Sequence, residues 1–374
     1  MNRFQFSCLS SMALALLVTN SPLAGEINSR EAAFQIQGEY HGRIVLPGFP
    51  RESGLQVVAT SETTFDAYLL GGGLPGAGWD RQNRVLYQGS GSSHVTFTNP
   101  ESPLSFRYLE AYPGCLFVFR NGYRIGTFRK LTRVSPTMHL PAPERAIILF
   151  NGKDEPRLKN VRVNSNGTLG IGAETIDQVQ NMRLHVEFKT PFEPHESGQG
   201  RGNSGIYIQR RYEVQILDSF GLELEPNRCG GLYKQKSADI NMALPPETWQ
   251  TYDIYFYAAK FDESGKRTHR ARITVVQNGV RIHDDYELLN KTGAGRPESP
   301  SPGPIWFQDH RNKVQFRNLW MVSLADGEVL ASDRNPAYGI LPPEEKAPAV
   351  KPANGCELMR PKLPFAPGRF LFRR

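Results

Sequence analysis

The sequence has few cysteines, no block of like charges and, beyond its first 25 residues, no long apolar run. Its 374 residues include four cysteines, no CxxC pair and a formal net charge of +7. So sparse a cysteine set excludes a disulfide-stapled mini-domain, and the missing CxxC pair excludes a zinc knuckle. Basic residues alternate with acidic ones, which argues against nucleic acid as a partner. No membrane span is expected outside the N-terminal segment.

Residues 1–25 are expected to be a secretory signal peptide. Arg3 precedes the apolar stretch 12–18, and small residues lie near Ala24. The stretch is too short to span a bilayer as a helix. We therefore expect a secreted or periplasmic protein. Its mature chain would have about 350 residues, enough for two domains.

Short strand patterns fill the rest of the chain. Residues 30–139 predict a β-rich N-terminal domain of unknown role, and residues 145–324 predict a second β domain. Asn-Gly pairs at 121–122 and 278–279 predict two-residue hairpin turns. Residues 325–374 form a proline-rich tail that is expected to wrap the surface or stay mobile. The pattern predicts an all-β protein, a jelly-roll sandwich preceded by a smaller β-rich domain.

Two further expectations concern local structure. Only residues 174–182 could form a turn or two of helix, because helical periodicity is absent elsewhere. The segment 182–190 alternates, which predicts that Arg183, His185 and Glu187 are exposed opposite a buried apolar face.

Residues 202–221, GNSGIYIQRRYEVQILDSFG, alternate with a period of two, but their second face carries unusual polar residues. Aromatic, amide and carboxylate groups on a sheet suit a sugar, because amides and carboxylates bond hydroxyls while aromatic rings cover C–H faces. This face is predicted to hold Tyr207, Gln209, Glu213 and Gln215. The segment 305–310 adds Trp306, Gln308 and His310. Further substrate-binding candidates are Arg201 and Asn203, at the end of a glycine-rich rim loop (193–203), and Lys234, Gln235 and Asn241 in a later loop.

Five blocks in order resemble the 3-keto-disaccharide hydrolase domain family. They are LFNGKD (149–154), the 202–221 segment, WQTYDI (249–254), NGVRIHDD (278–285) and GPIWFQDHRNKVQFRNLWM (303–321). The resemblance implies a concanavalin A-like lectin/glucanase fold and cleavage of 3-keto-glycosides. Such domains are common in secreted bacterial proteins.

A ketone at C3 acidifies the C2 proton of a sugar. A base can therefore remove that proton, expel the group at C1 and leave an enone that water hydrates. Glu213 and His310 are the candidate base and acid, with their roles open, and Lys234 or an arginine is the candidate for the enolate. Gln215 stands where related glucanases carry a second acid, which disfavours double displacement unless a bulge brings in Asp218.

The sequence leaves cofactors and alternatives open. No cofactor is certain, and a divalent metal ion (Ca²⁺ or a transition metal) could polarise the ketone. No dinucleotide fingerprint is present, so a separate sugar oxidoreductase would have to supply the keto substrate. The alternatives are a non-catalytic carbohydrate-binding module of the same architecture and a cell-surface interaction protein.

Overall fold

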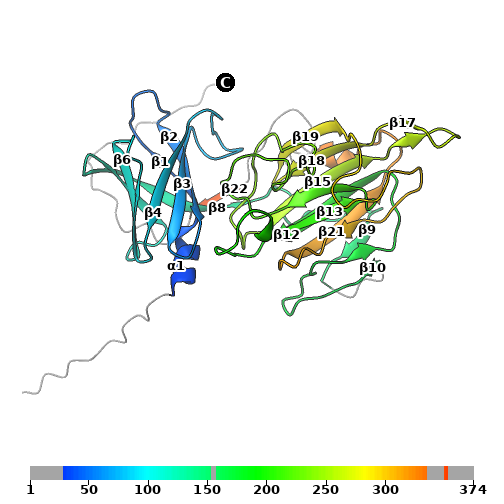
Figure 1. The fold of residues 1–374 in the computed structure, drawn as a ribbon, viewed down its shortest axis with the longest axis horizontal. Coiled ribbons are helices and arrows are strands. Elements are labelled where there is room, and N and C mark those ends of the chain that lie inside the picture. The colour runs from blue at the N-terminus through cyan, green and yellow to red at the C-terminus, as the bar shows by residue number, and fades with distance from the viewer. Residues whose placement is uncertain (1–27, 153–156, 335–348, 353–374) are drawn as a thin grey trace, which may run out of the picture.

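The computed structural model describes residues 28–152, 157–334 and 349–352, which are almost entirely β-structure (Figure 1). They form a closed sheet and a two-sheet sandwich that lie side by side along the long axis of the molecule. The prediction of an all-β sandwich preceded by a smaller β-rich unit is confirmed. The predicted signal peptide, and residues 335–348 and 353–374 of the tail, lie outside the described residues.

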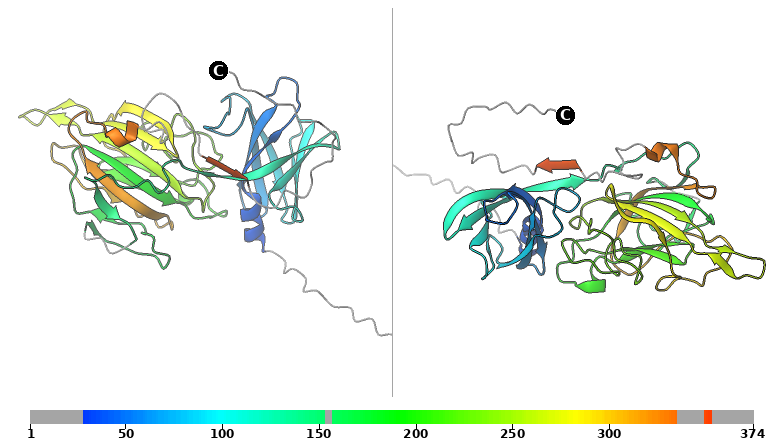
Figure 2. Two further views of the ribbon diagram at one scale, coloured as in Figure 1. Left: turned by 180° about the vertical axis from the view of Figure 1, so that it is seen from behind. Right: turned by 90° about the horizontal axis from the view of Figure 1, so that it is seen from above.

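The N-terminal unit begins with α1 (Ser29–Ile36) and continues as strands that pair in chain order. These are β1 (Gly38–Arg43), β2 (Glu52–Ala59), β3 (Thr64–Gly71), β4 (Arg84–Ser90), β5 (His94–Thr98), β6 (Leu104–Leu109), β7 (Cys115–Arg120) and β8 (Tyr123–Val134). The sheet closes because β1 pairs with both β2 and β8, and apolar side chains such as Phe97 and Phe106 fill its interior. A late strand, β22 (Ala349–Pro352), pairs with the end of β8 (Figure 2).

The sandwich consists of a five-stranded and a six-stranded sheet. In spatial order the first holds β10 (Leu158–Lys159), β11 (Glu174–Thr175), β20 (Trp306–Phe307), β13 (Ser204–Ile208) and β14 (Tyr212–Ile216). The second holds β19 (Val280–Glu287), β18 (Arg272–Gln277), β15 (Gln250–Tyr257), β12 (Met182–Lys189), β21 (Gln315–Ser323) and β9 (Ile147–Phe150). A small pair, β16 (Lys260–Phe261) and β17 (Arg267–His269), and two short 3₁₀ turns, η1 (Gly198–Gly200) and η2 (Ala331–Arg334), complete the elements.

The core of the sandwich follows the period-two pattern. Ile206 and Val214 of one sheet and Leu184 and Ile254 of the other are fully buried in one cluster. Alternate residues of β13 and β14 therefore point away from the core, to the outer face of the five-stranded sheet. Both Asn-Gly hairpins are confirmed, because residues 121–122 and 278–279 have positive φ between paired strand ends.

Helix placement differs from the expectation. Residues 174–182 contain the short strand β11 and no helix, whereas residues 29–36 form α1. The Asn28 side chain accepts a hydrogen bond from the Glu31 N–H and so caps α1. Its apolar residues pack on the barrel, so tertiary contact stabilises a segment too short to be helical alone. Within the described residues no helix is long and apolar enough to cross a membrane.

The predicted exposure of Arg183, His185 and Glu187 on β12 is wrong. All three are fully buried. Residues 135–140, which leave β8, and η2 lie over this face of the six-stranded sheet and supply hydrogen-bonding partners to it. The polar residues of β12 do alternate with apolar ones, but a second layer of chain covers their face.

The two units are joined by specific contacts. Arg201 of the sandwich donates to the carbonyl oxygen of Ala59 at 2.9 Å. In the other direction, Arg84 of the barrel donates to the carbonyl oxygen of Gly221 at 2.7 Å. Phe192 packs among the apolar residues of the barrel. These contacts lie on the segments that enter β13 and leave β14.

Candidate active site

A row of side chains crosses all five strands of the outer sheet face. In register, Lys159 pairs with Glu174, Glu174 with Trp306, Trp306 with Tyr207, and Tyr207 with Glu213. Residues directly opposite on neighbouring strands point to the same face, so these five side chains form one line, the polar row. The sheet thus brings together Tyr207, Trp306 and Glu213, three residues that the sequence singled out.

Glu213 lies at the β14 end of the polar row and is only 2 % exposed. Its carboxylate lies over Gly205, the diagonal neighbour on β13, where any Cβ would overlap the Glu213 side chain. Burial raises the pKa of Glu213 to about 7, and the hydrogen bond from Tyr207 opposes that rise.

Three groups hold Glu213 in place. The Tyr207 hydroxyl donates to its carboxylate and itself accepts from the Ala294 N–H. The Glu213 N–H donates to Thr292 Oγ1 at 2.6 Å. With its amide nitrogen toward Glu213, Gln215 donates to Glu213 Oε1 at 3.1 Å and to the Ser204 carbonyl oxygen at 2.8 Å. A carboxylate with a pKa near 7 in a fixed position suits proton transfer.

A loop containing Thr292 and Gly293 covers the carboxylate. A Cβ at Gly293 would lie 3.2 Å from Glu213 Oε2 and 3.2 Å from the Tyr207 hydroxyl oxygen. Gly293 is itself exposed, and Tyr233 beside it is partly exposed. The missing Cβ of Gly293 therefore leaves room beside the Glu213 carboxylate oxygen and the Tyr207 hydroxyl.

Amide groups extend the site toward the start of β13. Asn203 donates to the Gln199 carbonyl oxygen at 2.8 Å, and Gln199 lies 3.1 Å from the Gln215 amide. The Gln308 N–H donates to the Gly205 carbonyl oxygen at 2.8 Å, but its buried side-chain oxygen has no hydrogen-bonding partner among the described residues. An unpaired buried oxygen on a residue that neighbours Gly205 is suited to accept from a ligand hydroxyl.

The other end of the polar row is strongly charged. The Arg210 guanidinium lies 3.9 Å from the centre of the Trp306 ring. Arg210 also donates to Glu174, which pairs with Lys159 at 2.6 Å as well. Burial alone would raise the pKa of Glu174, but the hydrogen bonds and charges of Lys159 and Arg210 lower it overall. Glu174 is therefore ionised, and its carboxylate is already paired with two cations.

Four predicted binding residues have structural partners instead. Gln209 is not on the strand face: β13 ends at Ile208, and Gln209 starts the turn with φ of 54° and donates to the Val179 carbonyl oxygen. Arg201 is buried and pairs with Asp218 at 2.6 Å. Gln235 donates to the Asn290 carbonyl oxygen and Asn241 to the Ser219 carbonyl oxygen, so both tie loops together.

The remaining two, His310 and Lys234, are exposed. His310 follows the end of β20 after two residues. Lys234 occupies a turn with φ of 59°, and its ammonium lies 5.4 Å from the Tyr233 ring centre. Neither has a hydrogen bond to Glu213, so their roles stay predictions.

Several site residues have no clear mark in the sequence. Gly205, Thr292 and Gly293 shape the surroundings of Glu213, and Arg210 and Glu174 form the far end of the polar row. The glycines of KTGAGR (291–296) were the one visible signal, since glycine often marks close backbone approach. The others follow only from strand register.

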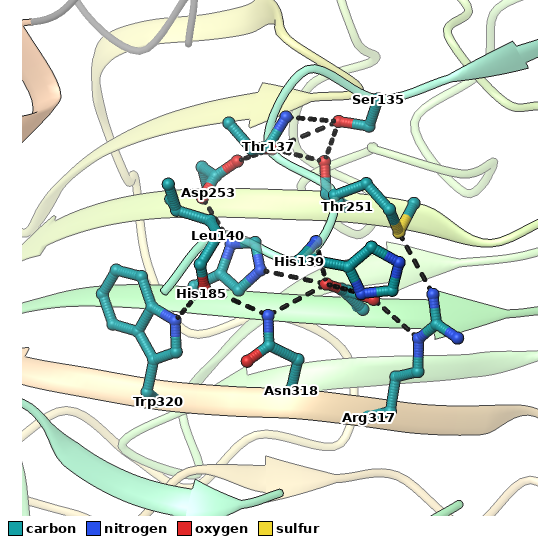
Figure 3. A network of polar contacts seen from close by, with 12 residues as sticks. Ser135, Thr137, His139, Leu140, His185, Thr251, Asp253, Arg317, Asn318 and Trp320 are labelled. Carbon is teal, nitrogen blue, oxygen red and sulfur yellow. Dashed lines mark hydrogen bonds and ion pairs between the residues drawn. The ribbon is translucent and has the colours of Figure 1, made fainter. Parts of the chain in front are cut away.

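A second polar cluster lies on the six-stranded sheet (Figure 3). His185 lies 2.7 Å from Asp253 and stacks on Trp320, and Glu187 accepts from the His139 N–H at 2.6 Å and from Asn318 at 2.9 Å. Burial lowers the pKa of His185, but the Asp253 charge and hydrogen bond raise it overall. His185, Glu187, Asp253 and Trp320 are fully buried, so this cluster joins residues 135–140 to the sheet.

No other feature of the described residues competes as a site. A cavity of about 660 Å³ lies between α1, β8 and residues 244–248, and one of about 460 Å³ lies beside β17. Neither is lined by a member of the polar row. Across the described residues, no three His, Cys, Asp or Glu side chains converge to hold a metal ion.

The comparisons with known proteins point to the same part of the chain. Residues 145–322 match the model of the 3-keto-alpha-glucoside-1,2-lyase-like domain. Three solved structures of candidate glycosyl hydrolases from Parabacteroides distasonis ATCC 8503 are similar. The first is 32 % identical, covering 49 % of this chain and 85 % of its own with a TM-score of 0.46. The second is 19 % identical, covering 49 % and 95 % with a TM-score of 0.37. The third is 22 % identical, covering 48 % and 94 % with a TM-score of 0.32. No curated protein matches the chain.

The protein is a carbohydrate-acting enzyme with an all-β sandwich fold. Through residues 145–322 it belongs to the family of 3-keto-alpha-glucoside-1,2-lyase-like domains.

Proposed function

We propose that the enzyme cleaves glycosides already oxidised at C3, with Glu213 as the base that removes the C2 proton. The observation that carries this proposal is a single buried carboxylate whose pKa is raised to about 7. Such a group is partly ionised at neutral pH and can accept a proton from an acidified carbon. The family match supports the substrate class.

A paired-carboxylate mechanism does not fit the described residues. Glu174, the other carboxylate of the polar row, is three strands from Glu213, or ~14 Å between strand axes. Glycosidase carboxylates are about 5–9.5 Å apart. Glu174 is also paired with Arg210 and Lys159, and Asp218 is paired with Arg201. In the part of the chain that the structure describes, neither Glu174 nor Asp218 is therefore free to act with Glu213 in a double displacement.

The proposed reaction has three balanced steps. Glu213 takes the C2 proton, and the C–H electron pair forms an enolate with the C3 ketone. The enolate then restores the ketone while a C1–C2 double bond forms and the C1–O bond breaks, so that the leaving group departs with a proton. Water finally adds at C1, C2 regains a proton, and a free 3-keto-sugar results.

Named residues have defined tasks in this scheme. Tyr207 and Gln215 orient Glu213, and Gln308 accepts from a sugar hydroxyl. His310, exposed after β20, supplies the leaving-group proton, and Lys234 stabilises the enolate. Because His310 donates this proton, His310→Asn should slow the cleavage of substrates with poor leaving groups more than the cleavage of activated aryl substrates.

The proposed chemistry determines how the substrate is supplied, and residues 1–25 indicate where the enzyme acts. Because the sugar must arrive as a ketone, a separate sugar oxidoreductase must act first. The signal-like residues 1–25 support a secreted or periplasmic site of action.

The experiment is a side-by-side incubation with a disaccharide and its 3-keto form, followed by detection of released monosaccharide. Cleavage of the 3-keto form alone is expected. Equal cleavage of both would restore an ordinary glycosidase mechanism. Binding of either sugar without cleavage would restore the alternative of a carbohydrate-binding module.

A further inference from the structure

The Arg210 side chain is held rigidly at the charged end of the polar row. Its guanidinium stacks on Trp306, and its Nε–H donates to the buried Glu174 carboxylate. The turn itself is fixed, because the Arg296 N–H donates to the Arg210 carbonyl oxygen at 2.7 Å. Stacking and the ion pair together fix the plane of the guanidinium.

The two terminal nitrogens of this guanidinium have no hydrogen-bonding partner within the described structure. No hydrogen bond joins either terminal nitrogen of Arg210 to another described residue, and the side chain is 28 % exposed. A fixed guanidinium whose terminal nitrogens remain available presents parallel donors, the geometry that matches a carboxylate.

The local charge also favours an anion. Lys159 and Arg210 share one carboxylate, Glu174, so the three groups carry a net charge of +1. Lys159 is the more exposed cation, at 55 %. A negatively charged ligand group would therefore be attracted to this end of the polar row, because the two cations outweigh the negative charge of Glu174.

The distance to Glu213 suits a neighbouring sugar. Trp306 is two strands from Glu213, ~10 Å between strand axes. That span is comparable to the length of a disaccharide, so a ring at Glu213 would place its neighbour over Trp306 and Arg210.

We propose that Arg210, positioned by Glu174 and Trp306, is an anion subsite that binds the carboxylate of a uronic acid unit next to the reacting ring. This inference rests on the proposed function for the identity of the reacting ring, but the binding itself does not require turnover. The subsite selects a glycoside whose second unit is acidic.

The test is an NMR titration of the intact protein with D-glucuronate, D-glucose and D-glucose 6-sulfate. Glucuronate should bind more tightly than glucose, and added salt should reduce the difference. Arg210→Gln should weaken glucuronate binding about 10- to 100-fold, as expected for a charge-assisted hydrogen bond. Arg210→Lys keeps the positive charge but loses the parallel N–H donors of the guanidinium, so it should lose part of the affinity for glucuronate. This variant decides the test if Arg210→Gln does not fold.

Arg157→Gln is the matched control. Arg157 is an exposed arginine near the same sheet edge that pairs with Asp177, outside the polar row, so its loss should leave glucuronate binding unchanged. Equal affinity for glucuronate and glucose, or unchanged glucuronate affinity in both Arg210 variants, would overturn the subsite. Binding of glucose 6-sulfate without glucuronate would overturn the choice of carboxylate. Because these are binding measurements, they stay informative even if the 3-keto chemistry fails its own test.

Discussion

The Glu213 carboxylate lies directly over Gly205, its diagonal neighbour across the β13–β14 pair. Gly205 has no Cβ to fill that space, and its φ is not in the positive region. A glycine in a paired strand usually weakens the strand, so its presence here indicates that a side chain needs the room.

Gly205→Ala should therefore displace Glu213 without backbone strain. We expect a loss of activity of about 10²-fold or more, since the base would leave its position. Initial rates and the melting temperature should be measured together. Gly126→Ala is the control, because a Cβ at that strand position meets only the Arg43 carbonyl oxygen at 3.3 Å. Full activity in Gly205→Ala would contradict the placement of the carboxylate.

The pH dependence of catalysis should report Glu213. A general base must be deprotonated, so kcat/KM should rise with pH through an apparent pKa near 7. Glu213→Gln should lose about 10²- to 10⁴-fold in rate. A rate that falls as pH rises through 7 would instead make Glu213 the acid and leave the base to another residue.

Glu213 should also affect stability in a pH-dependent way. Its folded-state pKa is raised to about 7, so its favourable contribution is present below the unfolded-state value and is lost as pH rises through about 7. The stability of Glu213→Gln relative to wild type should therefore increase between pH 5 and pH 8. Melting curves at both pH values measure this, and an unchanged difference would contradict the burial of a titrating carboxylate.

The buried cluster under the linker should matter for stability and not for chemistry. Asp253→Asn leaves Arg183 and His185 without their shared carboxylate, a loss expected to cost about 3–5 kcal/mol. The pKa of Asp253 is lowered to about 2, so its contribution is present above the unfolded-state value and lost as pH falls toward 2. Denaturant unfolding measures the change. Asp326→Asn, which breaks an exposed pair with Lys260, should leave the free energy of unfolding almost unchanged.

Contacts between the N-terminal unit and the sandwich should stabilise the folded protein. Arg201→Met removes the ion pair with Asp218 and the bond to the Ala59 carbonyl oxygen, both buried, and should cost about 3–5 kcal/mol. Arg30→Ala removes one part-buried bond to the Phe192 carbonyl oxygen and should cost about 1 kcal/mol. Similar unfolding free energies for the two variants would contradict the central place of Arg201 in the interface.

Strand alternation and Asn-Gly turns were enough to predict the all-β fold and both hairpins, because each is a local signal. Alternation also placed Tyr207, Glu213 and Gln215 on one face. It could not show that Gln209 lies in the turn, since two positive-φ residues there are not marked by glycine. Nor could it show that residues 135–140 cover His185, or that Glu174 lies opposite Trp306, because both depend on contacts between distant segments. The sequence does not mark the role of Gly205, because its closeness to Glu213 depends on the register of β14.

The most direct test of the account is exchange of the C2 hydrogen. A 3-keto-glycoside whose C1 carbon is joined to carbon instead of oxygen cannot lose its leaving group, so proton abstraction can be observed alone. Incubated with the enzyme in D₂O and followed by ¹H NMR, it should lose its C2 signal rapidly with wild type and at the uncatalysed rate with Glu213→Gln. Cleavage of the matching O-glycoside by an enzyme that causes no C2 exchange, or equal exchange by folded Glu213→Gln, would contradict Glu213 as the base.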